Sequence, residues 1–198
     1  MNISLKGRRL TTPTVTTLNP DKPESSLFFA NTLVRLLDEL STRFAQLVVL
    51  CIGSDRCTGD SLGPLAGSVL EDLNPRGCTV FGTVKQPVHA LNLAQTIEQI
   101  DREFYFPCIL AVDACLGRKE KVGLLEIGRG SLNPGAGVKK ELPPVGDIFI
   151  TGIVNVGGAM EFMVLQNTRL GVVIPMANFI AKGIFEALSK SSWGRTYQ

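Results

Sequence analysis

The segment VVLCIGSDRCTGDSLGPLAG, residues 48–67, runs from an apolar strand through a glycine-rich loop into a helix. It is close to a phosphate-binding loop, in which a lysine and a hydroxyl residue follow the second glycine and hold phosphates and Mg²⁺. Here Asp60 occupies the lysine position, and five residues separate Gly53 from Gly59 where a phosphate-binding loop has four. A carboxylate at that position repels phosphate. Nucleotide or phosphate binding is therefore the weakest of three hypotheses for this loop.

Composition sets the class of protein. A chain of 198 residues that is 44% hydrophobic predicts one domain with a sizeable core, at 25–198, after a loosely ordered arm at 1–24 that is rich in Thr and Pro. The net charge of +2 comes from scattered residues, so we expect no nucleic-acid or membrane partner. No leader and no apolar run of about 18 to 20 residues is evident, which predicts a cytoplasmic protein. Five cysteines without CxxC spacing predict reduced thiols.

Apolar periodicity predicts alternating strands and helices. Apolar residues at three-to-four spacing predict helices over 26–44, 60–73 and 91–104. Continuous apolar runs predict buried strands over 47–53, 78–84 and 107–117, with further strands over 122–128 and 148–158. The remainder to about Lys190 reads as helical, with a break at or before Pro175. This order predicts an α/β protein, a three-layer sandwich with a mostly parallel central sheet.

Two acids are the leading catalytic candidates. Asp60 opens a helix after the first predicted strand, and Asp113 ends the third. Loops at the carboxyl ends of parallel strands form the binding sites of open α/β sheets, so the two carboxylates are expected to share a cleft. Close carboxylates push their pKa values apart and activate water for hydrolysis. A helix cap is the structural alternative for Asp60, and a buried partner is the alternative for Asp113.

Other side chains at this edge are secondary candidates. His89 is the only histidine, and with Asp60 and Asp113 it offers a divalent metal site; no other cofactor is predicted. Cys57 and Cys115 offer a weaker Cys–His hydrolase. Further candidate contributors to the site are Ser61, Asp55 and Asn155. The glycine-rich segments 133–138 and 152–158 suit either a peptide groove or tight turns.

Five motifs together resemble the YyaC family of sporulation proteins from endospore-forming bacteria, over residues 47–188. They are IGSDRCTGDSLGPL (52–65), PVHALNL (87–93), AVDACLGR (111–118), PGAGVKKELPPVGDI (134–148) and TGIVNVGGAMEFMVLQNTRL (151–170). That family is similar to the spore germination protease and, more remotely, to the hydrogenase maturation endopeptidases. The resemblance implies a phosphorylase/hydrolase-like fold. It also implies that GDSLGP places Asp60, and VDACL places Asp113, at the two catalytic aspartate positions of the germination protease.

The resemblance departs from the maturation endopeptidases at the histidine. Those enzymes use a histidine that follows the second aspartate to grip nickel in their substrate, whereas His89 precedes Asp113. The expected function is an aspartate-dependent endopeptidase of the sporulating cell or spore core that acts on a peptide or protein. Backbone N–H groups of the Gly59–Leu62 turn or of the glycine loops are the expected oxyanion donors. An inactive peptide- or metal-binding regulator is the alternative. The apolar region 160–188 is expected either to cover the sheet or to form a homo-oligomer.

Overall fold

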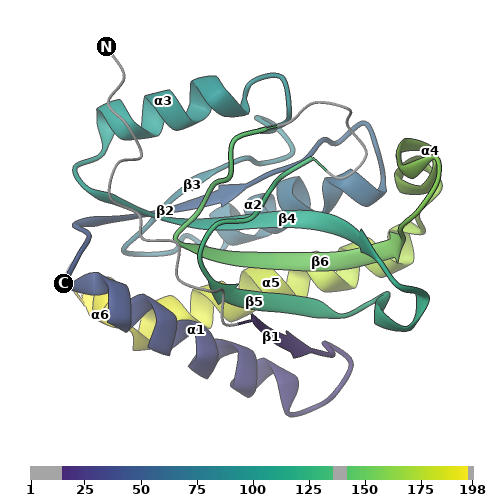
Figure 1. Cartoon of the computed structure of the whole chain (residues 1–198). Coiled ribbons are helices and arrows are strands. Elements are labelled where there is room, and N and C mark those ends of the chain that lie inside the picture. Colours follow the sequence, from purple (N-terminus) through teal and green to yellow (C-terminus); the bar gives the residue numbers. More distant parts are fainter. Residues whose placement is uncertain (1–14, 136–141, 196–198) are drawn as a thin grey trace.

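The computed structural model describes residues 15–135 and 142–195, which form one central sheet between two layers of helices (Figure 1). The strands of this described part are β1 Val15–Leu18, β2 Gln46–Cys51, β3 Thr79–Phe81, β4 Pro107–Gly117, β5 Leu125–Arg129 and β6 Ile148–Val156. The α-helices are α1 Ser25–Ser41, α2 Leu62–Asp72, α3 Leu93–Glu103, α4 Glu161–Gln166, α5 Leu170–Lys190 and α6 Ser192–Arg195. Two short 3₁₀ helices are η1 Gly59–Ser61 and η2 Lys119–Lys121.

The sheet is mostly parallel. Its described strands lie in the order β1-β5-β6-β4-β2-β3. β3, β2, β4 and β6 run parallel, and β5 and β1 close one side as antiparallel strands. β2 and β4 are direct neighbours, with Cys51 opposite Val112, so Asp113, the next residue on β4, lies just beyond the end of β2. The expectation that Asp113 ends its strand needs a correction, because β4 continues to Gly117. The predicted α/β sandwich is confirmed.

Both faces of the sheet are covered, as the unbroken apolar runs predict. Leu47, Val49 and Cys51 of β2 face the larger core, which also holds buried side chains of α1, α2 and α5. The alternate residues Val48 and Leu50 face a smaller core together with residues of α3. In Figure 1, α3 accordingly lies on the opposite side of the sheet from α1 and α5. Three layers result, with the sheet in the middle.

The predicted elements agree closely with the observed ones. β4 has the predicted bounds, and the break predicted at or before Pro175 falls between α4 and α5. Pro175 itself lies inside α5. A proline there removes one N–H donor to the carbonyl four residues earlier, which belongs to Gly171. Gly171 is exposed, so water can satisfy that carbonyl and the helix continues.

The predicted loose arm at 1–24 needs a correction in its last part. Val15–Leu18 form β1, which pairs antiparallel with β5, Val15 opposite Gly128 and Leu18 opposite Leu125. Asn19 then starts a turn in which its backbone carbonyl accepts the Ser25 hydroxyl at 2.6 Å. Four alternating residues carry too little apolar periodicity to reveal an edge strand, because half of such a strand faces solvent. Residues 1–14 lie outside the described part.

One helix corrects the expectation that no apolar segment is long enough to span a membrane. Among the described helices, α5 is long and apolar enough by length and composition alone. Its buried residues, including Val173, Ile180 and Ile184, belong to the larger core beside α1 and α2. Gly183 allows a close crossing, because a Cβ there would lie 2.3 Å from the Phe29 ring of α1. α5 is therefore a core helix of this fold.

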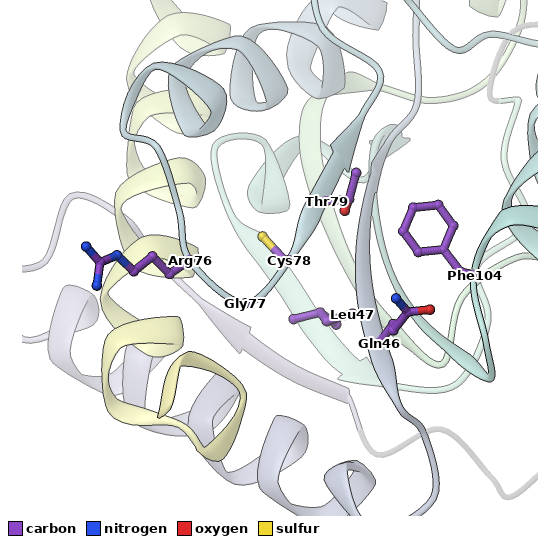
Figure 2. A pocket seen from close by; sticks show the side chains of 7 residues that line it. All are labelled: Gln46, Leu47, Arg76, Gly77, Cys78, Thr79 and Phe104. Atoms are coloured by element: carbon purple, nitrogen blue, oxygen red, sulfur yellow. The ribbon is translucent and has the colours of Figure 1, made fainter. Parts of the chain in front are cut away.

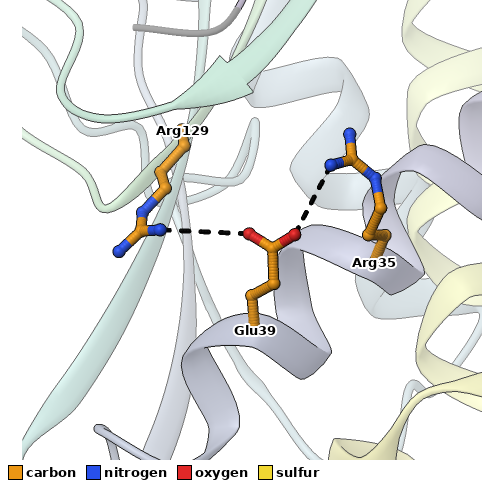
Figure 3. Close-up of polar contacts among 3 residues, drawn as sticks. All are labelled: Arg35, Glu39 and Arg129. Atoms are coloured by element: carbon orange, nitrogen blue, oxygen red, sulfur yellow. Dashed lines mark hydrogen bonds and ion pairs between the residues drawn. The ribbon is translucent and has the colours of Figure 1, made fainter. Parts of the chain in front are cut away.

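An exposed ion-pair cluster links α1 to the sheet. Glu39 forms two ion pairs (Figure 3). Its Oε1 lies 3.4 Å from Nη1 of Arg35, one turn earlier in α1, and its Oε2 lies 3.9 Å from Nη1 of Arg129 in β5. The side chains are solvent-accessible, so each pair contributes at most a few tenths of a kcal/mol. The apolar faces beneath them hold α1 in place.

Candidate active site

The carboxyl ends of β2 and β4 hold the candidate site, and three backbone hydrogen bonds organise it. Ile52 N–H donates to Val112 O at 2.7 Å, which extends the ladder between the two strands. Gly53 N–H donates to Val88 O at 2.8 Å, and Ser54 N–H donates to Asp60 O at 3.0 Å. The loop after β2, the segment around residue 88 and η1 are therefore fixed to one another at this edge.

Two glycines allow this close approach. Gly53 has φ +140°, and a Cβ there would lie 1.9 Å from the carbonyl oxygen of Asp60. A Cβ on Gly59 would lie 2.8 Å from side-chain atoms of Leu165 and Thr168, which belong to α4 and the turn after it. The turn that carries Asp60 is thus enclosed between β2 and the α4 segment, and no larger residue fits at either glycine.

Asp60 lies in η1 and is half-buried. Burial raises the pKa of its carboxyl group to about 6, while the Ser54 backbone N–H and the charge of His89 lower it. The helix-cap alternative finds no support: the residue at the N-cap of α2 is Ser61, and it makes no side-chain capping bond. The groups that act on the Asp60 carboxyl group are instead the Ser54 backbone N–H and the charge of His89.

Asp113 is a buried carboxyl group on β4, 5% exposed. Its Oδ1 accepts the Ala114 N–H at 2.8 Å, and the Gly135 N–H also lowers its pKa. Burial first, and the negative charge of Asp60 second, nevertheless raise the Asp113 pKa well above its ordinary value. The charge of Asp60 therefore acts on Asp113, as expected for two acids placed at one edge of the sheet.

His89 lies directly after Val88, which pairs with Ile52 just beyond the end of β2. Val88 forms a parallel bridge with Ile52, and the His89 backbone N–H donates to Asn92 Oδ1 at 2.8 Å. The ring nitrogen Nδ1 accepts the Leu91 N–H at 3.3 Å. His89 also acts on the charge of Asp60. The structure thus brings His89 to the same edge as the two acids.

The described residues contain no cluster of side chains suited to the predicted metal site. Within residues 15–135 and 142–195, no three His, Cys, Asp or Glu side chains are grouped so that they could hold a metal ion. Asp60, His89 and Asp113 share an edge and interact electrostatically, but they do not form the compact donor set that a metal centre requires.

The candidate nucleophiles are poorly activated. Burial raises the pKa of the Cys115 thiol to about 11, and burial also raises the pKa of Cys57. A thiol needs a lowered pKa to attack as thiolate at neutral pH. The Ser61 hydroxyl donates to Thr58 O at 2.7 Å, so it serves the turn that carries Asp60.

Three backbone amides of the Gly59–Leu62 turn, where oxyanion donors were expected, have acceptors within their own loop. The backbone N–H groups of Gly59 and Asp60 point to the sulfur of Cys57 and lower its pKa. The Ser61 N–H donates to Thr58 O at 3.3 Å. These amides already have acceptors, which leaves little of this turn for a substrate oxyanion. Cys57 is better described as the sulfur that orders the loop.

The two remaining predicted contributors differ. Asp55 is exposed in the turn between β2 and η1. The Asn155 side-chain N–H donates to Thr168 Oγ1 at 3.1 Å and to Val164 O at 3.4 Å, so it fixes α4 to the end of β6. The glycine segment 133–138 lies partly outside the described residues. Its Gly135 amide reaches Asp113, a contact that no sequence signal announces.

The segment beside the acids carries exposed apolar side chains. Within residues 156–174, the large apolar side chains that are exposed to solvent are those of Val156, Met160, Phe162, Met163, Leu170 and Ile174. We call this set the α4 patch. Leu165, the buried residue of α4, meets Gly59 of η1, so the α4 patch adjoins the turn that holds Asp60. Figure 1 shows α4 at the end of the sheet where β6 finishes.

A separate pocket of about 360 Å³ lies at the other edge of the sheet (Figure 2). Its lining includes Gln46 and Leu47 at the start of β2, Thr79 at the start of β3, and Cys78. Burial raises the pKa of the Cys78 thiol to about 12, so this thiol is unreactive. None of the predicted site residues lines this pocket.

Comparisons with known proteins agree with this architecture. The family model described as "Protein of unknown function (DUF1256)" matches residues 18–183. The chain is 54% identical over 138 residues to "Uncharacterized protein YyaC" of Bacillus subtilis (strain 168), covering 70% of this chain and 67% of that protein. It is also similar to the crystal structure of a NiFe hydrogenase maturation protease, HycI, from Thermococcus kodakarensis KOD1. That match has a TM-score of 0.53 and 16% identity, and it covers 78% of this chain and 99% of the other. At this identity the likeness shows the fold.

Proposed function

We propose that this chain, which belongs to the DUF1256 family, is a sporulation protein that hydrolyses peptide bonds with Asp60 and Asp113 as a proton-sharing pair. The observation that carries the proposal is the placement of two acids from different elements at one edge of the sheet, where the charge of Asp60 contributes to the raised pKa of Asp113. The protease-like fold supports it. The sporulation role rests on the motif resemblance and on the YyaC relative.

The protonation states follow from the two environments. The Asp60 pKa of about 6 makes its carboxylate ionised at neutral pH, whereas the deeper burial of Asp113 favours its protonated form. Such a pair titrates as a unit, with one shared proton between the two macroscopic pKa values. One group is then a base and the other an acid at the same pH.

The proposed reaction uses both forms. Asp60 takes a proton from water, the water oxygen bonds to the peptide carbonyl carbon, and Asp113 gives its proton to the carbonyl oxygen. Asp60 then returns its proton to the amide nitrogen as the carbon–nitrogen bond breaks. The hydroxyl formed on the carbonyl oxygen returns its proton to Asp113 as the C=O bond is restored. A carboxylic acid and an amine result, and both aspartates regain their starting states.

The substrate class follows from the surroundings of the pair. The α4 patch offers exposed apolar side chains, two of them methionines, which adapt to apolar side chains of differing shape. An extended peptide with apolar residues beside the scissile bond fits this composition. We propose that the substrate is a protein or peptide of this kind, cut inside the cell.

The test is cleavage by the purified protein. We expect incubation with a spore-core extract to yield discrete new N-termini, read by mass spectrometry, and Asp60→Asn to abolish them. Asp72→Asn is the matched control, because Asp72 is an exposed aspartate at the far end of α2. Equal cleavage by wild type and Asp60→Asn would overturn the proposal.

The exposed α4 patch also favours a second function, a non-catalytic peptide-binding regulator. On that hypothesis the wild-type protein retains peptides from the same extract and produces no new N-termini. Phe162→Ser, which removes one exposed ring of the α4 patch, would then weaken retention, whereas Asp60→Asn would leave it unchanged. Under the leading proposal, both substitutions reduce fragment formation.

A further inference from the structure

We infer that Asn155 and Thr168 are positioning residues that latch α4 against the turn that carries Asp60. We call residues 156–168 the flap, and the two positioning side chains the latch. The inference rests on the proposed function, because the latch sets the position of one of its two acids. Its test measures the flap and the acid directly and requires no cleavage, so a failure of this inference and a failure of the proposed function can be told apart.

The latch is a network of hydrogen bonds between β6 and the end of the flap. Asn155, near the end of β6, donates from Nδ2 to Thr168 Oγ1 at 3.1 Å and to Val164 O at 3.4 Å. The Thr168 hydroxyl donates in turn to Val164 O at 2.9 Å. Asn155 lies opposite Leu116 of β4, so the latch is anchored in the middle of the sheet. Thr168 is buried, and a buried hydroxyl that loses its partners is costly.

The flap also touches the residue before Asp60. A Cβ added to Gly59 would lie 2.8 Å from Thr168 Oγ1 and 2.9 Å from Leu165 O. The oxygen that the latch holds is therefore the oxygen that lies against η1. The Ser54 N–H holds the other side of this turn, through its hydrogen bond to Asp60 O at 3.0 Å. A displaced Thr168 would thus leave the turn fixed on one side alone.

The flap buries little of its own surface. Residues 156–163 are exposed, and Leu165 is the buried residue of α4. Gly158 has φ +144°, a conformation that glycine adopts without strain, and a Cβ there would meet nothing within 4 Å. Segments with little buried apolar surface open at a low free energy, and small residues often form their hinges. We therefore expect the latch, rather than apolar packing, to decide how often the flap opens.

The burial of Asp60 makes the position of the flap measurable. Burial is the largest cause that raises the Asp60 pKa to about 6. The ionisable groups that interact with this carboxyl group are His89, Asp113 and Cys57, and none of these three belongs to the flap. The latch side chains are uncharged. Displacement of the flap therefore acts on Asp60 by admitting water, which lowers its pKa toward the ordinary value.

Four variants form a matched set for the test. Thr168→Val removes the hydroxyl and keeps the shape of the side chain, and Asn155→Ala removes the other half of the latch. Thr168→Ser keeps the hydroxyl and is expected to behave as wild type. Asn167→Ala is the control within the flap, because the Asn167 Nδ2 donates at 2.8 Å to Met163 O of α4 and does not reach the sheet through this bond.

Amide hydrogen exchange of the full-length protein at fixed pH, read residue by residue by NMR, measures the opening. The Val164 amide reports on the flap, and the Ser54 amide, which donates to Asp60 O, reports on the turn. Both are expected to exchange about tenfold faster in the two latch variants, whereas the Ser54 amide stays within about twofold of wild type in the two other variants. Faster exchange at Val164 with an unchanged Ser54 amide would overturn the positioning role, because the flap would then open without freeing the turn.

The second readout is a ¹³C-carboxyl titration of Asp60, assigned by loss of its signal in Asp60→Asn. Both latch variants are expected to lower the Asp60 midpoint by about half to one pH unit, and Thr168→Ser and Asn167→Ala by less than about 0.2. A purely structural latch would change stability and leave this midpoint in place. A midpoint that neither latch variant moves overturns the inference and leaves the proposed function to its own test, cleavage by wild type and Asp60→Asn.

Discussion

Asp113 and Asp147 are buried aspartates on adjoining parts of one sheet, and they serve it in opposite ways. Asp147, just before β6, accepts the Ile109 N–H through Oδ2 at 2.9 Å, and its own N–H donates to Ile109 O at 2.7 Å. It extends the ladder between β4 and β6 at their starts. Asp113 lies further along β4, just beyond the end of β2, where the charge of Asp60 contributes to its raised pKa. Backbone donors stabilise the charged form of a buried carboxylate and so stabilise the fold. A neighbouring acid instead raises the pKa of a buried carboxyl group and favours its protonated form.

The largest expected effect separates these two acids by activity. Asp113→Asn is expected to reduce peptide cleavage by about 10²- to 10⁴-fold, because the pair loses the group that protonates the carbonyl oxygen. Asp147→Asn is expected to leave the turnover number of the folded fraction unchanged. Cleavage rates normalised to the folded fraction by circular dichroism measure both. A comparable loss in Asp147→Asn would break the distinction between the two ends of β4.

The next effect concerns stability and its pH dependence. The folded-state pKa of Asp60 is raised, to about 6, so the folded protein binds this proton more tightly than the unfolded chain does. The contribution of Asp60 to the unfolding free energy is therefore largest below its unfolded-state pKa of about 4. This contribution is lost as the pH rises through the folded-state pKa of about 6. Asp60→Asn removes this loss and is expected to stabilise the fold above pH 6 by up to about 3 kcal/mol.

Urea unfolding of wild type and Asp60→Asn at pH 4 and pH 8 measures this difference. The gain should be present at pH 8 and nearly absent at pH 4. Asp72→Asn serves again as the exposed control. A variant less stable than wild type at pH 8 would mean that the Asp60 carboxylate holds the fold together, which would place it in the same class as Asp147.

The structural acid should respond in the opposite direction. Asp147→Ala leaves the Ile109 N–H without its carboxylate acceptor in a buried position. We expect a loss of about 1 to 3 kcal/mol of unfolding free energy at pH 8, where Asp60→Asn gains. Both variants can be measured by the same urea titration. A gain in Asp147→Ala would show that its burial, too, is unfavourable.

The order of the strands in the sequence was enough to predict that Asp60 and Asp113 lie at the same edge of the sheet. Unbroken apolar runs identify β2 and β4 as buried parallel strands, so Asp60 after β2 and Asp113 on β4 were expected at one edge. Asp147 follows the glycine- and proline-rich loop, where no periodicity marks a strand start. Its structural role depends on the register between β4 and β6, which joins residues 38 positions apart. Local patterns contain no information on such a register.

The details of the candidate site were likewise beyond local patterns. The sequence placed His89 near the acids through chain order, but the hydrogen bond from the Leu91 N–H to its Nδ1 depends on the turn geometry. The Gly59–Leu62 amides were expected to face a substrate, and those of Gly59 and Asp60 instead face Cys57. A single cysteine in a loop has no pattern that distinguishes a sulfur acceptor from a buried thiol. Tertiary contacts decide these roles.

The smallest expected effect comes from an acid at the surface. Glu39 contacts both Arg35 and Arg129, which gives it more cationic partners than any other carboxylate in the ion pairs of the described residues (Figure 3). Its side chain is 42% exposed, so water already solvates the charge in both the folded and unfolded states. Glu39→Gln is therefore expected to change the unfolding free energy by less than about 0.5 kcal/mol at any pH. A pH-dependent change as large as that of Asp60→Asn would mean that ion-pair number, rather than burial, governs the acids of this fold.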